Sequence, residues 1–342
     1  MIEIDGLYLE GGGQILRTAC ALSAIRQIPC HIFNIRKGRK EPGLKPQHLL
    51  GLRALSELCN GKSEGDYLGS EEIWFYPGSL DKTKRELRIK IETAGSITLL
   101  LQTLIPPSLF AKEPITILIN GGATDTFFSP TIDHFRYVFL KILEKMGARI
   151  EVQIEKRGFY PKGGAKVKVI VYPTKLKPIT LTTCGALKEI IIISGASELL
   201  KERKVAERQI SGAKQILGKL KLPIKEIVEY YPTLSPGSQI NIIAKFENTI
   251  IGSDNLGKFQ KGAEIVGKEV ALEFLKEGKT GACLDKHLAD QILPFMALSQ
   301  GKSEVTVSEI TNHCRTNIWV IEKFLKGQFK IEGNKIIWES FR

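Results

Sequence analysis

The sequence predicts a mixed α/β protein of the α+β type, with a main domain of three βαβαββ units and a smaller inserted α/β domain. One order of strand and helix periodicities occurs in residues 2–77 and again in 87–172, and a related order follows residue 284. Residues 180–275 interrupt this order. With 342 residues, 43% of them apolar, the chain can bury a full core. We therefore expect the main domain to comprise residues 1–179 and 276–342, and the insert residues 180–275.

Apolar spacing places the elements of the first two units. The first is expected to contain strand 2–5, helix 14–25, strand 30–35, helix 47–58 and two short extended runs that end at residues 73–75. The second is expected to contain strand 87–91, helix 96–105, strand 115–119, helix 132–146 and a hairpin of 148–154 and 165–171.

The third unit and the insert are less regular. The third unit is expected to contain helix 284–298, strand 305–307, helix 318–325 and a hairpin that ends at residues 337–338, while its first strand has no clear pattern. The insert is expected to contain strand 190–194, basic helix 198–220, an extended pair within 232–246 and helix 263–274. The basic helix could contact a nucleic-acid backbone, although such a charge run is also typical of a solvated helix face.

The composition limits the classes of binding partner and cellular location that we expect. The formal charge of +12 and the pI of about 9.3 favour acidic partners, with nucleic acid as the first candidate. No apolar run reaches the ~18 residues of a membrane span, and the N-terminus has no signal-peptide pattern, so we expect a cytoplasmic protein. The six cysteines have no zinc-ligand spacing and are interpreted as mostly buried thiols.

A glycine-rich turn and a basic loop predict a phosphate site. Glycines 11–13 let the backbone approach a ligand, and the helix that follows would aim free N–H groups at an anion, with Arg17 one turn further on. Residues 36–48 carry five Lys or Arg against one acid, Glu41, which suggests a polyanionic substrate. Such turns and charge runs also occur in ordinary α/β proteins without a functional role.

Three of the five histidines are candidates for chemistry. His31 lies in a strand pattern and His134 in a helix, so both are interpreted as structural. His48 ends the basic loop, His287 opens a polar cluster, and His313 lies among Asn, Arg and Thr before the last long helix. Metal binding is a rival interpretation of these residues, but no His-x-x-x-His or carboxylate pairing supports a dedicated zinc or iron site.

Six ordered motifs resemble those of the RNA 3′-terminal phosphate cyclase family. They are GLYLEGGGQILR at 6–17, IRKGRKEPGLKPQH at 35–48, LQT at 101–103, RGFYPKGG at 157–164, HLADQILP at 287–294 and HCRTN at 313–317. The resemblance implies three βαβαββ units with an inserted domain. It also implies an ATP-dependent reaction in which a histidine takes AMP, AMP moves to the RNA 3′-phosphate, and the 2′-hydroxyl closes a 2′,3′-cyclic phosphate.

The resemblance implies roles for individual residues. His313 is the expected nucleophile, and Asp290 would orient a metal-bound phosphate or His313 itself. The positions matching the family's ATP site are Gln102, Pro130, His287, Leu288, Ala289, Asp290 and Gln291. The pocket for the RNA terminal phosphate or the ATP phosphates comprises Glu10, Gly13, Arg17, Arg36, Arg39, Gln47 and His48. Mg²⁺ or Mn²⁺ is expected to accompany ATP.

The sequence departs from the family pattern at three positions. Ala165 replaces a glycine, which we interpret as a difference in turn packing, and His287 replaces a tyrosine, which should alter the ATP contacts. Arg315 could hold phosphate and would lower the pKa of His313.

Two non-catalytic functions are alternatives to this hypothesis. A non-catalytic, cyclase-like RNA-binding protein in ribosome assembly would share the fold but would lack the nucleophilic histidine. A plain basic RNA-binding protein would account for the charge but not for the glycine-rich and His313 motifs.

Overall fold

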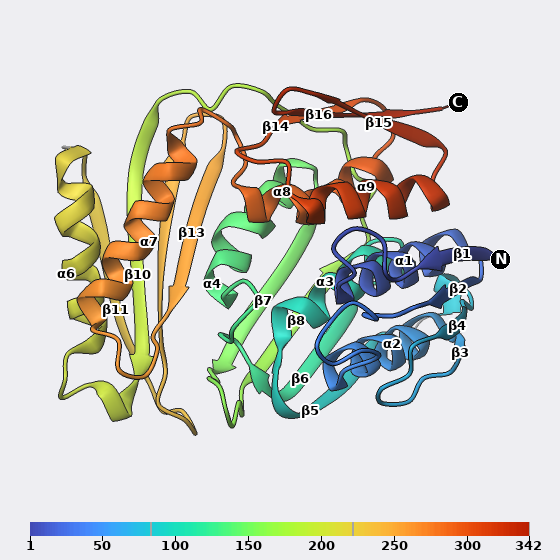
Figure 1. The fold of residues 1–342 in the computed structure, drawn as a ribbon, viewed down its shortest axis with the longest axis horizontal. Helices are drawn as coiled ribbons and strands as arrows, with labels where there is room; N and C mark the ends of the chain where they lie inside the picture. The colour runs from blue at the N-terminus through green and yellow to red at the C-terminus, as the bar shows by residue number, and fades with distance from the viewer. Residues whose placement is uncertain (83, 221, 342) are drawn as a thin grey trace.

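Residues 1–82, 84–220 and 222–341 are described by a computed structural model (Figure 1). It has a mixed α/β fold, as predicted, and its named strands form four-stranded sheets. Three of these sheets share one arrangement, in the orders β1-β2-β4-β3, β5-β6-β8-β7 and β9-β14-β16-β15. In each, the first two strands are parallel and the last two form an antiparallel hairpin.

The first two units contain the predicted elements in the predicted order, although the strands expected at 87–91 and 115–119 extend to Ser96 and Ala123. The first contains β1 (Ile2–Asp5), α1 (Gly13–Arg26), β2 (Cys30–Phe33), α2 (Pro46–Cys59), β3 (Lys62–Glu64) and β4 (Ile73–Tyr76). The second contains β5 (Glu86–Ser96), α3 (Ile97–Ser108), β6 (Ile115–Ala123), α4 (Ile132–His134), a π-helical segment (Phe135–Phe139), α5 (Leu140–Lys145), β7 (Arg149–Lys156) and β8 (Lys166–Tyr172). The helix expected at 132–146 is therefore continuous in space but changes its hydrogen-bonding pattern in the middle.

The third unit is split by the insert. It contains β9 (Thr180–Leu181), α8 (Lys286–Leu298), β14 (Ser303–Thr306), α9 (Asn312–Phe324), β15 (Gly327–Glu332) and β16 (Lys335–Ser340). The strand without a clear sequence pattern is β9, which pairs in parallel with β14. Two residues are too few to show a period, which explains why the strand was not located. Residues 180–181, assigned to the insert from sequence, thus belong to the third sheet.

The insert has a sheet and a core of its own. It contains β10 (Leu187–Ser197), α6 (Val205–Leu217), β11 (Ile224–Tyr231), β12 (Ser238–Phe246), β13 (Ile250–Leu256) and α7 (Ala263–Gly278). Apolar residues of β10, β12, α6 and α7 form this second core, separate from that of the main body. The prediction of one long helix over 198–220 was wrong, because Lys204 adopts a left-handed conformation with φ of 49° directly before α6.

The basic face of α6 is partly neutralised by acidic neighbours. Arg208 forms two hydrogen bonds to Glu264 of α7, and Lys214 lies 2.5 Å from Glu226 of β11. These pairs favour the solvated-face interpretation of this helix over a nucleic-acid contact.

Helices of the three units meet at the centre of the main body (Figure 1). Helix α1 packs against α2, α3 and α9, and α8 packs against both α3 and α9. This packing brings the N-terminal ends of elements from the first and third units together, although they are separated by most of the chain.

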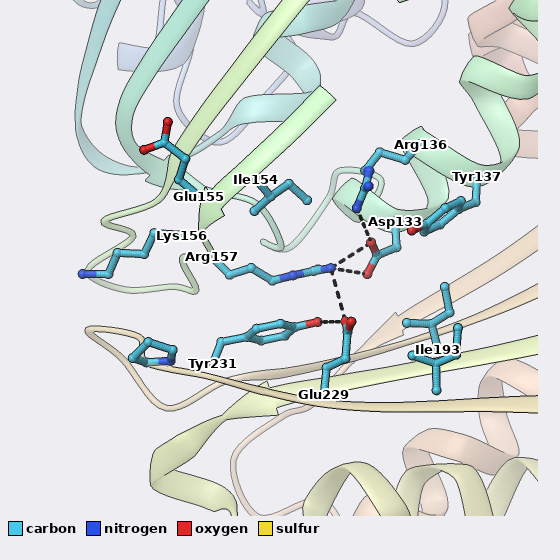
Figure 2. Close-up of a pocket in the computed structure, with 12 residues that line it drawn as sticks. Asp133, Arg136, Tyr137, Ile154, Glu155, Lys156, Arg157, Ile193, Glu229 and Tyr231 are labelled. Atoms are coloured by element: carbon cyan, nitrogen blue, oxygen red, sulfur yellow. Dashed lines mark hydrogen bonds and ion pairs between the residues drawn. The ribbon is translucent and has the colours of Figure 1, made fainter. Parts of the chain in front are cut away.

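A buried ion-pair cluster joins the insert to the second unit (Figure 2). Arg157, which follows β7, donates from Nη2 to both carboxylate oxygens of Asp133, at 2.8 and 2.7 Å. The same nitrogen lies 3.9 Å from Oε2 of Glu229 on β11, and the guanidinium lies over the ring of Tyr231, 4.6 Å from its centroid. These contacts line a surface hollow between the second unit and the insert, and because Arg157 pairs there with acidic groups of both, we assign the hollow to docking of the insert.

Two further predictions concern membrane-spanning helices and the cysteines. Across residues 1–82, 84–220 and 222–341, no helix has the length and apolarity to cross a membrane. All six cysteines carry free thiols, and five of them are buried, as predicted.

Candidate active site

The N-terminus of α1 is open because glycines form it. Gly12 is the N-cap and has no side chain to occupy the free N–H groups of the first turn, and Gly11 adopts a φ of +55°. Gly13 is required by packing, since a Cβ at this position would lie 2.1 Å from Nε2 of His48. The backbone N–H groups and the helix dipole thus form a site suited to an anion.

His48 supports this turn as a neutral ring. Its Nδ1 accepts a hydrogen bond from the backbone N–H of Lys45 at 3.2 Å, and only 6% of the residue is exposed. Burial lowers the pKa of His48 to about 3, and the positive charges of Arg17, Arg36 and Lys45 lower it further. His48 therefore does not add positive charge to the phosphate site at neutral pH.

His313 lies within the first turn of α9. The sequence placed the start of this helix at residue 318, but it begins at Asn312 because the Thr311 hydroxyl accepts the Cys314 N–H at 3.2 Å. The polar run that indicated a loop is therefore the capped first turn of the helix. This turn holds the imidazole over the N-terminal part of α1.

Two hydrogen bonds orient the imidazole through Gln14. The Gln14 Oε1 atom lies 2.5 Å from Nδ1 of His313, and the Gln14 Nε2 atom donates to Oδ2 of Asp290 at 2.9 Å. The amide oxygen can only accept, so Nδ1 carries the proton and Nε2 has the free lone pair. Asp290 is therefore linked to His313 through one bridging residue, Gln14.

Residues one helical turn further on extend this network. The Thr18 hydroxyl donates to Oδ1 of Asn317 at 2.8 Å, and Nδ2 of Asn317 donates to the Asp290 carbonyl at 2.8 Å. Sequence reasoning did not single out Gln14, Thr18 or Asn317. Their spacing in the sequence could have indicated them. Gln14 and Thr18 are polar residues four positions apart on one face of α1, and His313 and Asn317 are spaced in the same way on α9.

Glu10 and Arg39 lie at the open side of the ring. Oε1 of Glu10 is 3.8 Å from Nε2 of His313, and Nη2 of Arg39 donates to this Glu10 oxygen at 2.6 Å and to the Glu10 carbonyl at 2.7 Å. Partial burial lowers the pKa of His313, Glu10 opposes this shift, and Arg17 and Arg39 add to it. The direction agrees with the sequence prediction, but Arg315 is not among the main causes.

Asp290 and Arg17 are half-buried charged residues behind the network. Burial raises the pKa of Asp290 to about 7, although Arg17 opposes the shift. Burial also lowers the pKa of Arg17 to about 10, so it remains a cation at neutral pH. A titratable carboxyl linked through Gln14 to a histidine with a free Nε2, next to a helix N-terminus, is a combination suited to phosphoryl or nucleotidyl chemistry.

Comparison with known proteins identifies the family. The sequence profile described as "RNA 3'-terminal phosphate cyclase" matches residues 8–331. The chain belongs to the RNA 3′-terminal phosphate cyclase family. It is 47% identical over 334 residues to the RNA 3′-terminal phosphate cyclase of Pyrococcus abyssi, with 97% of this chain and 96% of that protein covered. The protein of the same name from Archaeoglobus fulgidus is 42% identical over 340 residues, with 98% and 99% covered.

Three of the expected ATP-site residues of this cyclase-family chain line one cavity. Gln102, Asp290 and Gln291 surround a cavity of about 40 Å³, together with Gln14 and Arg17. Leu288 and Ala289 are fully buried in the core, so their side chains are not available to a ligand. His287 lies at the start of α8, where its positive form would lower the pKa of His313.

Pro130, Arg36 and Gln47 lie elsewhere among the described residues, outside the hydrogen-bond network of His313. The Pro130 carbonyl accepts from the Thr98 hydroxyl at 2.9 Å, next to the junction with the insert. Arg36 donates to backbone carbonyls of its own loop, at 2.8 Å to Glu41 and 3.0 Å to Gly43. Gln47 lines a separate surface hollow against the second unit.

Within the part of the chain that the structure describes, no three His, Cys, Asp or Glu side chains are grouped as ligands of a metal ion. A magnesium ion that arrives with nucleotide phosphates needs only one or two protein carboxylates. The Glu10 carboxylate lies at the open side of His313, where Arg39 donates to it.

Proposed function

We propose that this protein is an RNA 3′-terminal phosphate cyclase that uses ATP to convert an RNA 3′-phosphate into a 2′,3′-cyclic phosphate through a histidine-AMP intermediate on His313. The observation that carries the proposal is the bond between Nδ1 of His313 and Gln14, because it leaves Nε2 free and fixes its direction. Family membership supports the substrate class, since the relatives compared are named for this activity.

The first step suits the electrostatics of His313. Its lowered pKa keeps the ring neutral at pH 7, so Nε2 can attack the α-phosphorus of ATP. The new bond joins Nε2 to phosphorus, and the bond from phosphorus to the bridging oxygen breaks, so that pyrophosphate leaves with the electron pair. The imidazolium charge that develops is shared through Nδ1–H with Gln14 and, beyond it, Asp290.

The next two steps consume the intermediate. An oxygen of the RNA 3′-phosphate attacks the AMP phosphorus, and the bond to Nε2 breaks. The 2′-hydroxyl then attacks the 3′-phosphorus, loses its proton, and displaces AMP. Each step needs positive charge and in-line positioning more than proton transfer, which Arg17, Arg39 and the N-terminus of α1 can supply. Glu10 would contact Mg²⁺ or Mn²⁺ bound to the nucleotide, and the cation would neutralise charge on the phosphates.

Labelling with ATP that carries the label in its α-phosphate tests the proposal. The wild-type protein, incubated with Mg²⁺ or Mn²⁺, should acquire acid-labile, alkali-stable AMP, and His313→Ala should acquire none. His31→Asn is the matched control, because His31 lies on β2 in the sheet of the first unit, where it contacts Glu72 and stacks on Trp74. Absence of label from all three proteins would instead support a non-catalytic RNA-binding function, and label on His313→Ala would assign the nucleophile to another residue.

A further inference from the structure

Two partly exposed aromatic rings are stacked beside the candidate active site. The rings of Tyr8 and Trp319 have centroids 4.2 Å apart and planes inclined by 13°. Tyr8 is 37% exposed although one face of its ring lies on Trp319, which leaves the opposite face of the ring outside the stack. Neither residue takes part in the steps proposed above.

The two stacked residues are near His313 because of their positions in the chain. Tyr8 precedes Glu10 by two residues, and Glu10 lies 3.8 Å from Nε2 of His313. Trp319 follows His313 by six residues on α9, a rise of about 9 Å along the helix axis. Both rings therefore lie within a few residues of groups at the His313 ring, a separation that the last few nucleotides of a chain ending at His313 can span.

Cations flank the ring pair. On α9, Nζ of Lys323 lies 5.3 Å from the Trp319 centroid, and the exposed Arg315 is four residues before Trp319, on the same helix face. The loop that carries Tyr8 also lies against the basic loop, because Arg39 donates to the carbonyl of Glu10 at 2.7 Å. The exposed Lys37 and Lys40 flank Arg39 in that loop.

We infer that Tyr8 and Trp319 form a stacking platform for a base near the 3′ end of single-stranded RNA, with Arg315 and Lys323 beside the RNA backbone. This inference rests on the proposed function, which places the terminal phosphate at His313. A flat aromatic face bordered by cations matches the two chemical components of a nucleotide, a π-face and a phosphate. The bases must be unpaired, because a duplex keeps their faces covered. Stacking accepts every base, so the platform would bind RNA ends with little sequence preference.

Binding of RNA by variants of the stack tests the inference. The probe is a hexaribonucleotide with a 3′-phosphate, titrated without ATP against wild type, Tyr8→Ala and Trp319→Leu. Stacking of one base is worth about 1–3 kcal/mol, so each variant should bind about 5- to 160-fold more weakly. Tyr8→Phe and Trp319→Phe keep an aromatic face and should restore most of the affinity. Tyr67→Ala is the matched control, since Tyr67 is 64% exposed in the loop between β3 and β4 and should leave the affinity unchanged.

Two further readouts separate this inference from the proposed function. Lys323→Gln should weaken binding and reduce its dependence on salt. Labelling of wild-type His313 by ATP, which needs no RNA, is measured on the same preparation. Wild-type label together with equal hexamer affinity in Tyr8→Ala and wild type would overturn the platform alone. Absence of wild-type label would overturn the proposed function, whatever the variants bind.

Discussion

Nδ1 of His313 lies 2.5 Å from Oε1 of Gln14, although 299 positions separate the two residues. One belongs to the first turn of α9 in the third unit, and the other to the first turn of α1 in the first unit. The candidate nucleophile and the group that orients it are therefore supplied by opposite ends of the chain. Neither unit can form this site alone.

Replacing Gln14 should slow AMP transfer to His313. Gln14→Ala removes the acceptor of Nδ1–H, so the ring can rotate and change tautomer, and we expect the labelling rate to fall about 10- to 100-fold. Rapid-quench measurement of label incorporation at saturating ATP checks this. Gln209→Ala, which removes a buried glutamine from the insert, should leave the rate unchanged. A normal rate in Gln14→Ala would mean that the hydrogen bond does not position the nucleophile.

The labelling rate should rise with pH as Asp290 loses its proton. The pKa of Asp290 is raised to about 7, and its carboxylate form holds the Gln14 amide more strongly than the protonated form does. The pKa of His313 is lowered from its ordinary value, so His313 loses its proton at a lower pH than Asp290 does. The rate should increase through pH 7 and then level off. In Asp290→Asn this increase should disappear; if it persists unchanged, another group is responsible.

His48 should make the fold sensitive to acid. Its pKa is about 3 in the folded protein and near 6.5 when unfolded, so the unfolded state binds more protons between these values. The stability is fully present above pH 6.5 and falls as the pH decreases, by on the order of 4 kcal/mol at pH 3. The free energy of unfolding, measured by urea titration at each pH, should decrease less steeply in His48→Asn. Parallel curves for the two proteins would contradict this assignment.

Gly13→Ala should destabilise the N-terminus of α1. The added Cβ would lie 2.1 Å from the ring of His48, which is itself held by the Lys45 N–H. Overpacking of this kind costs about 1–3 kcal/mol, more than alanine gains from its helix propensity. Thermal unfolding measures the loss. The control is Gly278→Ala at the end of α7, where a Cβ meets nothing within 4 Å and the melting temperature should stay the same or rise.

Arg157→Leu should loosen the docking of the insert. The change leaves Asp133 buried without its main cation, and loss of one partner of a buried pair costs about 3–5 kcal/mol. We expect a lower melting temperature and faster proteolysis between the insert and the second unit. Arg88→Leu breaks an exposed pair with Glu86 and should change the melting temperature little. Equal behaviour of the two variants would mean that the buried pair does not hold the insert.

Regular periodicity explains which elements could be predicted. Helices α1 and α2 and strand β1 lie within one or two residues of their predicted bounds, because their apolar spacing is complete, and glycine or proline also marks the starts of the two helices. The start of α9 and strand β9 were missed for different physical reasons. Polar first turns resemble loops until the Thr311 cap is seen, and a two-residue strand exists only through its partner β14.

The sequence by itself determined the mixed α/β class, the family resemblance and the residue types of a phosphate site, because periodicity and ordered motifs are properties of neighbouring residues. Only the tertiary structure decided which of those residues act together. It joined Gln14 to Asp290 and His313 across 276 and 299 positions, and it tied Arg36 to its own loop. These contacts depend on how α1, α8 and α9 pack, and local sequence patterns carry no information about which helix faces which.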